Sequence, residues 1–200
     1  MTSAGTSYRS RRYALQNRWD PRHLTTVKEL LPFTPGDEVL ELGCGRGHLA
    51  KRMKELGLLV TGVDANTKAP EVAVTDNLHS MRVEALAFPD ASFDGIVSFH
   101  MIEHVPELEQ ALVEMHRVLR PGGHALLVYP AEPIRGAYSW PASIILHGTP
   151  FRAREIHVHK LNPSRLQAMT SQAGFEHVHS EFHFRFTPQY ATVLRRPATP

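Results

Sequence analysis

The sequence predicts an α/β fold with a doubly wound, mostly parallel seven-stranded sheet whose last strand is antiparallel. Three observations predict it. Short apolar runs alternate with stretches of helical periodicity, which is typical of parallel sheets. A turn with three glycines, Gly43, Gly45 and Gly47, follows the first apolar run directly. The last two apolar runs, 175–184 and 189–194, lie close enough in sequence to pair antiparallel.

The elements of the first half begin and end at turn residues. A helix opens at Asp20-Pro21 and stops before Pro32, because proline fits a first turn but blocks a helix interior. A second helix follows the glycines and ends near Gly57. The second helix is predicted to turn Leu49, Met53 and Leu56 toward the core. Strands are predicted at 38–42, 58–63 and 81–86. No firm helix is predicted over 65–80.

The second half contains the clearest helix, which begins at Pro106 and ends before Pro121. Glu107 and Glu109 in its first turn complement the helix dipole. Its apolar residues recur at i, i+3 and i+4 on one face, namely Leu108, Ala111, Leu112, Met115, Val118 and Leu119, and Arg117 and Arg120 are placed in its last turn. A final helix runs from the Asn162-Pro163 cap to Gly174, and the remaining strands are 94–99, 124–129, 175–184 and 189–194.

The strand over 175–184 alternates in character. The polar residues His177, His179, Glu181 and His183 share one face, and Val178, Phe182 and Phe184 share the other. The alternation predicts a solvated polar face over a buried aromatic face.

The turn over 39–50, VLELGCGRGHLA, has the chemistry of a ligand site. Glycine tolerates positive φ and leaves room where a ligand touches backbone. The spacing Gly43, Gly45, Gly47 is not the G-x-G-x-x-G of pyrophosphate sites, and Glu41 would repel a pyrophosphate. A carboxylate there suits an ammonium or sulfonium ligand. The alternative is a tight strand–helix turn without a ligand.

Composition excludes several classes of protein. The chain of 200 residues with 42% hydrophobic content is expected to form one domain over 1–200, with a basic arm at 1–18. A formal net charge of +2 makes nucleic acid an unfavoured partner. The single cysteine, Cys44, excludes a disulfide framework. No apolar run approaches 18 residues and no signal peptide is present, so we expect a cytoplasmic protein without a membrane span.

Four sequence blocks occur in a characteristic order. They are VLELGCGRG at 39–47, VTGVDAN at 60–66, ALAFPDASFDGIVSFHMIEHV at 85–105 and MHRVLRPGGHALLVYP at 115–130. In this order and spacing they resemble the class I S-adenosylmethionine-dependent methyltransferases, especially their compact, small-molecule, type 11-like branch. The resemblance implies a Rossmann-like sheet, S-adenosylmethionine as cofactor, S-adenosylhomocysteine as product, a small-molecule acceptor and a monomer or homodimer.

The resemblance also implies the cofactor contacts. Glu41 and the glycine turn would hold the methionine part, and Asp64 would accept the ribose hydroxyls from the end of the second strand. The alternative for Asp64 is a turn or cap aspartate. Further cofactor contacts are expected from Ala65, Val83, Glu84 and Phe99.

One departure concerns the adenine. The family often has Asp-Ala where this chain has Arg82-Val83, and an arginine cannot accept a hydrogen bond from the adenine amino group. Either the backbone around Val83 and Glu84 reads the adenine, or the Glu84 carboxylate substitutes for the aspartate.

The catalytic candidates follow the fourth predicted strand. His104 is the preferred general base, because histidine titrates near neutrality, and His100 is the second candidate. The alternative is that Glu103-His104 only supports the loop. His100, Glu103 and His104 are also metal-ligand types, with His157 or His159 as a further ligand, but we expect no metal.

The acceptor is expected to contact an insertion at 131–160, which is too long for a simple connection. Its aromatic and aliphatic residues predict a partly apolar or aromatic acceptor, methylated on oxygen or nitrogen. The arginine-rich arm leaves RNA or protein methylation as one alternative. A cofactor-binding partner subunit without turnover is another.

Overall fold

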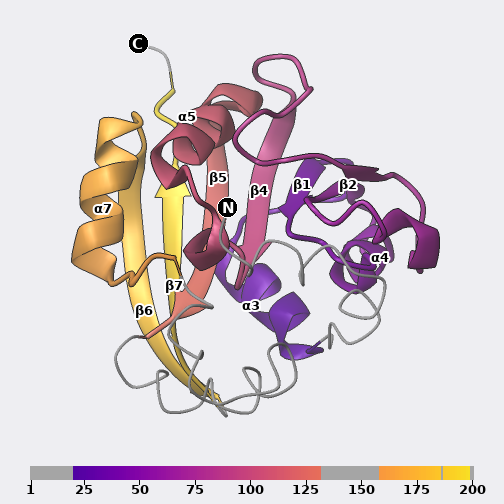
Figure 1. The fold of residues 1–200 in the computed structure, drawn as a ribbon, viewed down its shortest axis with the longest axis horizontal. Coiled ribbons are helices and arrows are strands. Elements are labelled where there is room, and N and C mark those ends of the chain that lie inside the picture. The colour runs from indigo at the N-terminus through magenta and orange to yellow at the C-terminus, as the bar shows by residue number, and fades with distance from the viewer. Residues whose placement is uncertain (1–19, 132–157, 186, 199–200) are drawn as a thin grey trace.

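The computed structural model describes residues 20–131, 158–185 and 187–198, which form one sheet covered by helices (Figure 1). The strands are β1 (Glu38–Leu42), β2 (Leu59–Asp64), β3 (Leu78–Ser80), β4 (Phe93–Phe99), β5 (Leu119–Pro130), β6 (Glu176–Arg185) and β7 (Thr187–Arg195). The helices are α3 (Arg22–Leu30), α4 (His48–Lys54), α5 (Leu108–Val118) and α7 (Pro163–Gln172), with 3-10 turns η1 (Pro70–Val72) and η2 (Ile102–His104).

The seven strands lie in the order β3-β2-β1-β4-β5-β7-β6. β1 pairs in parallel with β2 and β4, β2 with β3, and β4 with β5. β7 is antiparallel to both of its neighbours, because the connection from β6 is too short for a crossover. The predicted sheet, mostly parallel with an antiparallel last strand, is confirmed.

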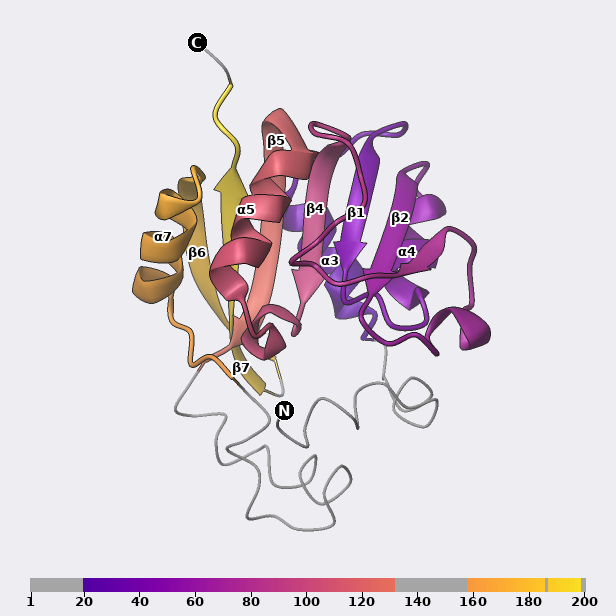
Figure 2. The ribbon, with the colours of Figure 1, turned by 45° about the horizontal axis from the view of Figure 1, so that its top comes forward.

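Helices cover both faces of the sheet (Figure 2). α3 and α4 pack on the face that carries Val39, while α5 and α7 pack on the face that carries Leu40. These consecutive β1 residues are both fully buried, as expected of a strand covered on two sides. The doubly wound arrangement places the carboxyl ends of β1, β2 and β4 at one edge, where ligands bind in such sheets.

Most predicted elements are confirmed, with three corrections. The strand predicted at 81–86 is wrong: β3 ends at Ser80, and the chain then turns, with the Ala85 N–H donating to the Arg82 carbonyl. Leu56 does not face the core and is 38% exposed, because α4 ends at Lys54. Arg120 lies outside α5, where β5 has already begun, and its guanidinium pairs with Glu38 and Asp94.

The faces of β6 also differ from the prediction. Val178, Phe182 and Phe184 are 49%, 49% and 68% exposed, whereas His177 and His183 are half-buried and hydrogen-bonded. β6 is an edge strand with β7 as its sheet neighbour, and a register shift between His177 and His179 interrupts its alternation. The aromatic face is therefore not a buried face.

Two predicted segments lie largely outside the described residues. They are the basic arm at 1–18 and the insertion at 131–160, of which only Ala131 and residues 158–160 are described. In the parts of the chain that the structure describes, no helix has the length and apolar character to cross a membrane.

Candidate functional site

The turn from β1 into α4 is built from left-handed backbone. Gly43, Gly45 and Gly47 have φ of +73°, +51° and +78°. A Cβ on Gly43 would lie 2.7 Å from the Met101 Cγ, so the residue before the turn must lack a side chain. The N–H groups of Gly43 and Cys44 donate to the Val63 carbonyl at 2.8 and 3.0 Å, which fixes the turn against the end of β2.

Glu41 enters the site from β1. Its side chain is buried, and its Oε2 has no hydrogen-bond partner among the described residues. Burial raises the pKa of Glu41 to about 8, against a hydrogen bond from the Ala50 N–H, and the charge of Asp64 raises it further. A buried carboxyl oxygen without a partner is costly, and a bound cation would supply the missing partner. The site therefore fits the ammonium or sulfonium ligand predicted from the sequence.

Asp64 at the end of β2 bonds to the glycine turn. Its Oδ2 accepts from the Gly45 N–H and its Oδ1 from the Asn66 N–H, both at 2.8 Å. Burial raises the pKa of this carboxyl and the two N–H donors oppose the shift. Each carboxylate oxygen keeps a further lone pair, so Asp64 can still accept ribose hydroxyls. Its role in bracing the turn was not predicted.

The predicted adenine side lies next to Asp64. The Met81 N–H donates to the Asp64 carbonyl at 3.1 Å, which brings the following residues to this edge. Val83 is buried, and the Glu84 carboxylate is ion-paired with Arg82. Arg82 uses one lone pair of the Glu84 Oε1, so the carboxylate can still accept a hydrogen bond from an adenine amino group. Ala65 is exposed beside Asp64.

His100, Glu103 and His104 come together after β4. The Glu103 Oε1 lies 3.7 Å from the His100 Nδ1 and 3.9 Å from the His104 Nε2. Glu103 is buried, which by itself raises its pKa, but the neighbouring His100 and His104 rings bring it down to about 2. The carboxyl is thus held as a carboxylate between two imidazoles.

His100 is held in an unusual conformation. Its φ is +53°, which is uncommon for a residue other than glycine and often marks a functional site. Its Nε2 is 3.0 Å from the Gln189 Oε1 on β7, and its N–H donates to the Val128 carbonyl at 2.8 Å. Contacts from β5 and β7 therefore compensate for the strain.

Residues 158–159 form hydrogen bonds with the turn η2. The N–H groups of Val158 and His159 donate to the Glu103 carbonyl at 2.9 and 3.0 Å, and the His159 ring is 2.8 Å from the Val105 carbonyl. His159 is a predicted metal-ligand candidate, but its Nε2 already forms a hydrogen bond with the Val105 carbonyl.

His23 is a residue of this edge that the sequence did not identify. It stands in the first turn of α3, and its ring stacks on Phe99 with centroids 4.2 Å apart. The sequence predicts a helix over 20–31 and does not single out His23 within it. The sole available signal was a histidine beside the Asp20-Pro21 start, which does not indicate where the helix docks.

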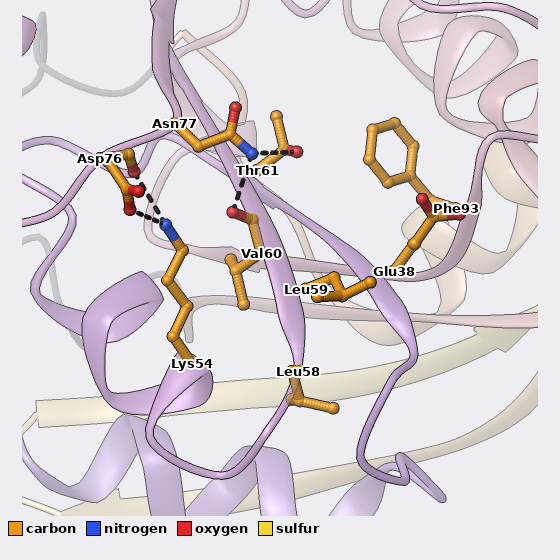
Figure 3. Close-up of a pocket in the computed structure, with 9 residues that line it drawn as sticks. All are labelled: Glu38, Lys54, Leu58, Leu59, Val60, Thr61, Asp76, Asn77 and Phe93. Carbon is orange, nitrogen blue, oxygen red and sulfur yellow. Dashed lines mark hydrogen bonds and ion pairs between the residues drawn. The ribbon is translucent and has the colours of Figure 1, made fainter.

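A hollow of about 520 Å³ lies at the opposite, amino edge of the strands (Figure 3). It is lined by Glu38, Lys54, Leu58, Leu59, Val60, Thr61, Asp76, Asn77 and Phe93. Its polar groups have partners: Lys54 pairs with Asp76, Asn77 bonds to Thr61 and the Val60 carbonyl, and Glu38 pairs with Arg120. None of the predicted site residues lines it.

Known proteins resemble this chain in sequence and in fold. A model of the methyltransferase domain family matches residues 8–180. A Mycolicibacterium smegmatis relative named as an S-adenosylmethionine-dependent methyltransferase is 36% identical, over 82% of this chain and 61% of its own length. An Idiomarina loihiensis ubiquinone biosynthesis O-methyltransferase is 33% identical, over 72% of this chain and 63% of its own length. The chain thus matches less than two thirds of either relative.

A solved structure shares the fold. It is the Haloferax volcanii chain described as a methyltransferase in complex with the Trm112 methyltransferase activator. The two superpose with a TM-score of 0.76 at 19% identity, covering 94% of this chain and 97% of that one.

Proposed function

Since the chain belongs to the class I S-adenosylmethionine-dependent methyltransferases, we propose that it transfers a methyl group to a hydroxyl oxygen of a small, partly apolar acceptor. The methyl-donor part of the proposal is carried by the buried Glu41 Oε2 at the glycine turn, which has no hydrogen-bond partner among the described residues. Oxygen is preferred over nitrogen as the methylated atom because the Idiomarina loihiensis relative is an O-methyltransferase and because two histidines stand at this edge.

Three groups would hold the cofactor. Glu41 would bind the ammonium of its methionine part, the glycine turn would bring backbone close to it, and Asp64 would accept the ribose hydroxyls. Val83, Glu84 and Phe99 would complete the contacts. When bound, the cofactor would supply a methyl group attached to a sulfonium sulfur. That sulfur is already a good leaving group, because it departs as a neutral thioether.

The chain's residues then have two tasks. Alignment of the acceptor oxygen with the methyl carbon and sulfur supplies most of the rate acceleration. His104 would take the hydroxyl proton as the carbon–oxygen bond forms and the carbon–sulfur bond breaks, and would release it to solvent. The buried Glu103 carboxylate beside it would offset the imidazolium charge.

The direct test is a radiolabelled methyl transfer assay against fractionated host extract. Label is expected in a small-molecule fraction. Label in tRNA, rRNA or protein would favour the macromolecular alternatives, and tight cofactor binding without any transfer would favour a partner subunit.

Cofactor binding tests the site itself. Asp64→Ala is expected to weaken the binding of S-adenosylhomocysteine by about 1–3 kcal/mol in calorimetry, because the ribose hydroxyls and the Gly45 N–H lose their acceptor. Asp76→Ala is the matched control, since Asp76 is an exposed aspartate at the amino edge. Binding of NADH in place of the methyl donor would contradict the proposal.

Metal dependence is expected to be absent. In the described ranges no three histidine, cysteine or acidic side chains are arranged to hold an ion, and the His159 ring is bonded to backbone. Turnover should therefore survive EDTA, measured before and after dialysis. Activity that EDTA removes and magnesium or zinc restores would make His100, Glu103 and His104 ligands.

A further inference from the structure

Three rings from two distant parts of the chain meet at the carboxyl edge of β4. The His23 ring of α3 stacks on Phe99 at a centroid distance of 4.2 Å and an interplanar angle of 22°. The same ring lies 6.3 Å from the His100 ring, tilted by 52°. His23 thus stands next to His100, the second candidate for the general base.

His23 is held in its neutral form. Burial lowers the pKa of His23 to about 4, and the charges of His100 and Arg22 act in the same direction against that of Asp20. At physiological pH the ring therefore offers one N–H donor and one nitrogen acceptor and carries no charge. Stacking on Phe99 uses the face of the ring and leaves these edge groups available.

The ring nitrogens of His23 form no hydrogen bond within residues 20–131, 158–185 and 187–198, where the ring contacts are with Phe99 and His100. A ring that served only to pack α3 on β4 could equally be a phenylalanine. A histidine with unused polar groups beside the reacting centre indicates a ligand with polar atoms.

We propose that His23 is a specificity-determining residue that hydrogen-bonds a neutral hydroxyl of the acceptor beside Phe99 and His100. The inference rests on the proposed O-methyl transfer and adds the class of acceptor, an uncharged phenol or catechol. An uncharged imidazole gives no Coulombic attraction to a carboxylate or phosphate, so it does not favour an anionic acceptor over a neutral one. A compound with a hydroxyl group on an aromatic ring can pack against the rings of Phe99 and His100 and can form a hydrogen bond with a His23 nitrogen.

The test is a binding experiment with defined probes. Protein labelled with ¹⁵N-histidine and saturated with S-adenosylhomocysteine is titrated with catechol and with 3,4-dihydroxybenzoate, and the His23 resonances are assigned from their loss in His23→Phe. His23→Phe keeps a ring on Phe99 and removes both nitrogens. The matched control is His124→Phe, the same change in the amino-terminal half of β5.

We expect catechol to shift the His23 resonances and to bind about tenfold more weakly to His23→Phe, the usual scale for one hydrogen bond. The affinity for S-adenosylhomocysteine should stay within about twofold, and the control should bind catechol normally. Thermal melting of both variants verifies that they fold.

Three results would overturn the inference: equal catechol affinity in His23→Phe, tighter binding of the benzoate than of catechol, or no catechol binding by the parent protein. The proposed function is judged separately by label transfer and cofactor binding. A parent protein that methylates another acceptor but does not bind catechol would retain the proposed function and lose this inference.

Discussion

His104→Ala is expected to lower turnover by about 100-fold or more while leaving the affinity for S-adenosylhomocysteine nearly unchanged. A phenol or alcohol must lose its proton as the methyl group arrives, and a positioned base typically contributes about 10²–10⁴-fold. Loss of rate without loss of cofactor affinity is the signature of a group that acts in the transition state. Turnover with the acceptor found by label transfer, together with calorimetry, measures both.

The pH dependence follows from the same role. The base must be unprotonated, so turnover should fall at acidic pH, where a histidine base takes up its proton, and His104→Ala should lose this dependence. The position of His104 favours its role as a general base. The turn η2 is held by hydrogen bonds from the Val158 and His159 N–H groups, and the Glu103 carboxylate lies within 4 Å of the His104 ring.

A structural histidine would behave differently. If His104 only supports the loop, His104→Ala would lower the melting temperature and leave the turnover of folded enzyme close to normal. His177→Ala is the matched control, a half-buried histidine on β6 bonded to Ser180. His177→Ala should lower the melting temperature without changing the pH dependence of turnover.

The parts of the site that the sequence could predict are those with local chemical signals. The glycines were recognisable because positive φ and close approach both select glycine, and all three adopt positive φ. Asp64 was identifiable from its place at the end of an apolar run. The strand and helix alternation determined the sheet, since buried parallel strands leave strong apolar runs in the sequence.

The parts that could not be predicted depend on contacts between distant segments. His23 meets Phe99 only because α3 docks over the end of β4, and no periodicity encodes that contact. β3 has three residues, one of them a half-buried leucine, which is too little for an apolar pattern. On β6, alternation revealed two faces, but which face is covered depends on its neighbours at the sheet edge.

Gly45→Val is expected to reduce the affinity for S-adenosylhomocysteine by more than about 100-fold in a protein that still folds. Gly45 has φ +51°, a conformation that a β-branched side chain rarely adopts. Its N–H also donates to the Asp64 carboxylate, so a turn that shifts to relieve the strain releases a residue proposed to bind the cofactor. Gly122→Val is the matched control: φ is +83°, and an added Cβ meets nothing within 4 Å.

Both valine variants carry backbone strain, so both should lose some thermal stability, and only Gly45→Val should lose binding. Equal cofactor affinity in the two would contradict the placement of the methionine part at the glycine turn. The double variant Gly45→Val, Asp64→Ala separates the two causes of the loss. If valine acts by releasing Asp64, the two effects will fall well short of additive, because the same contact is removed twice. If valine instead blocks the ligand directly, Asp64→Ala will add its own cost.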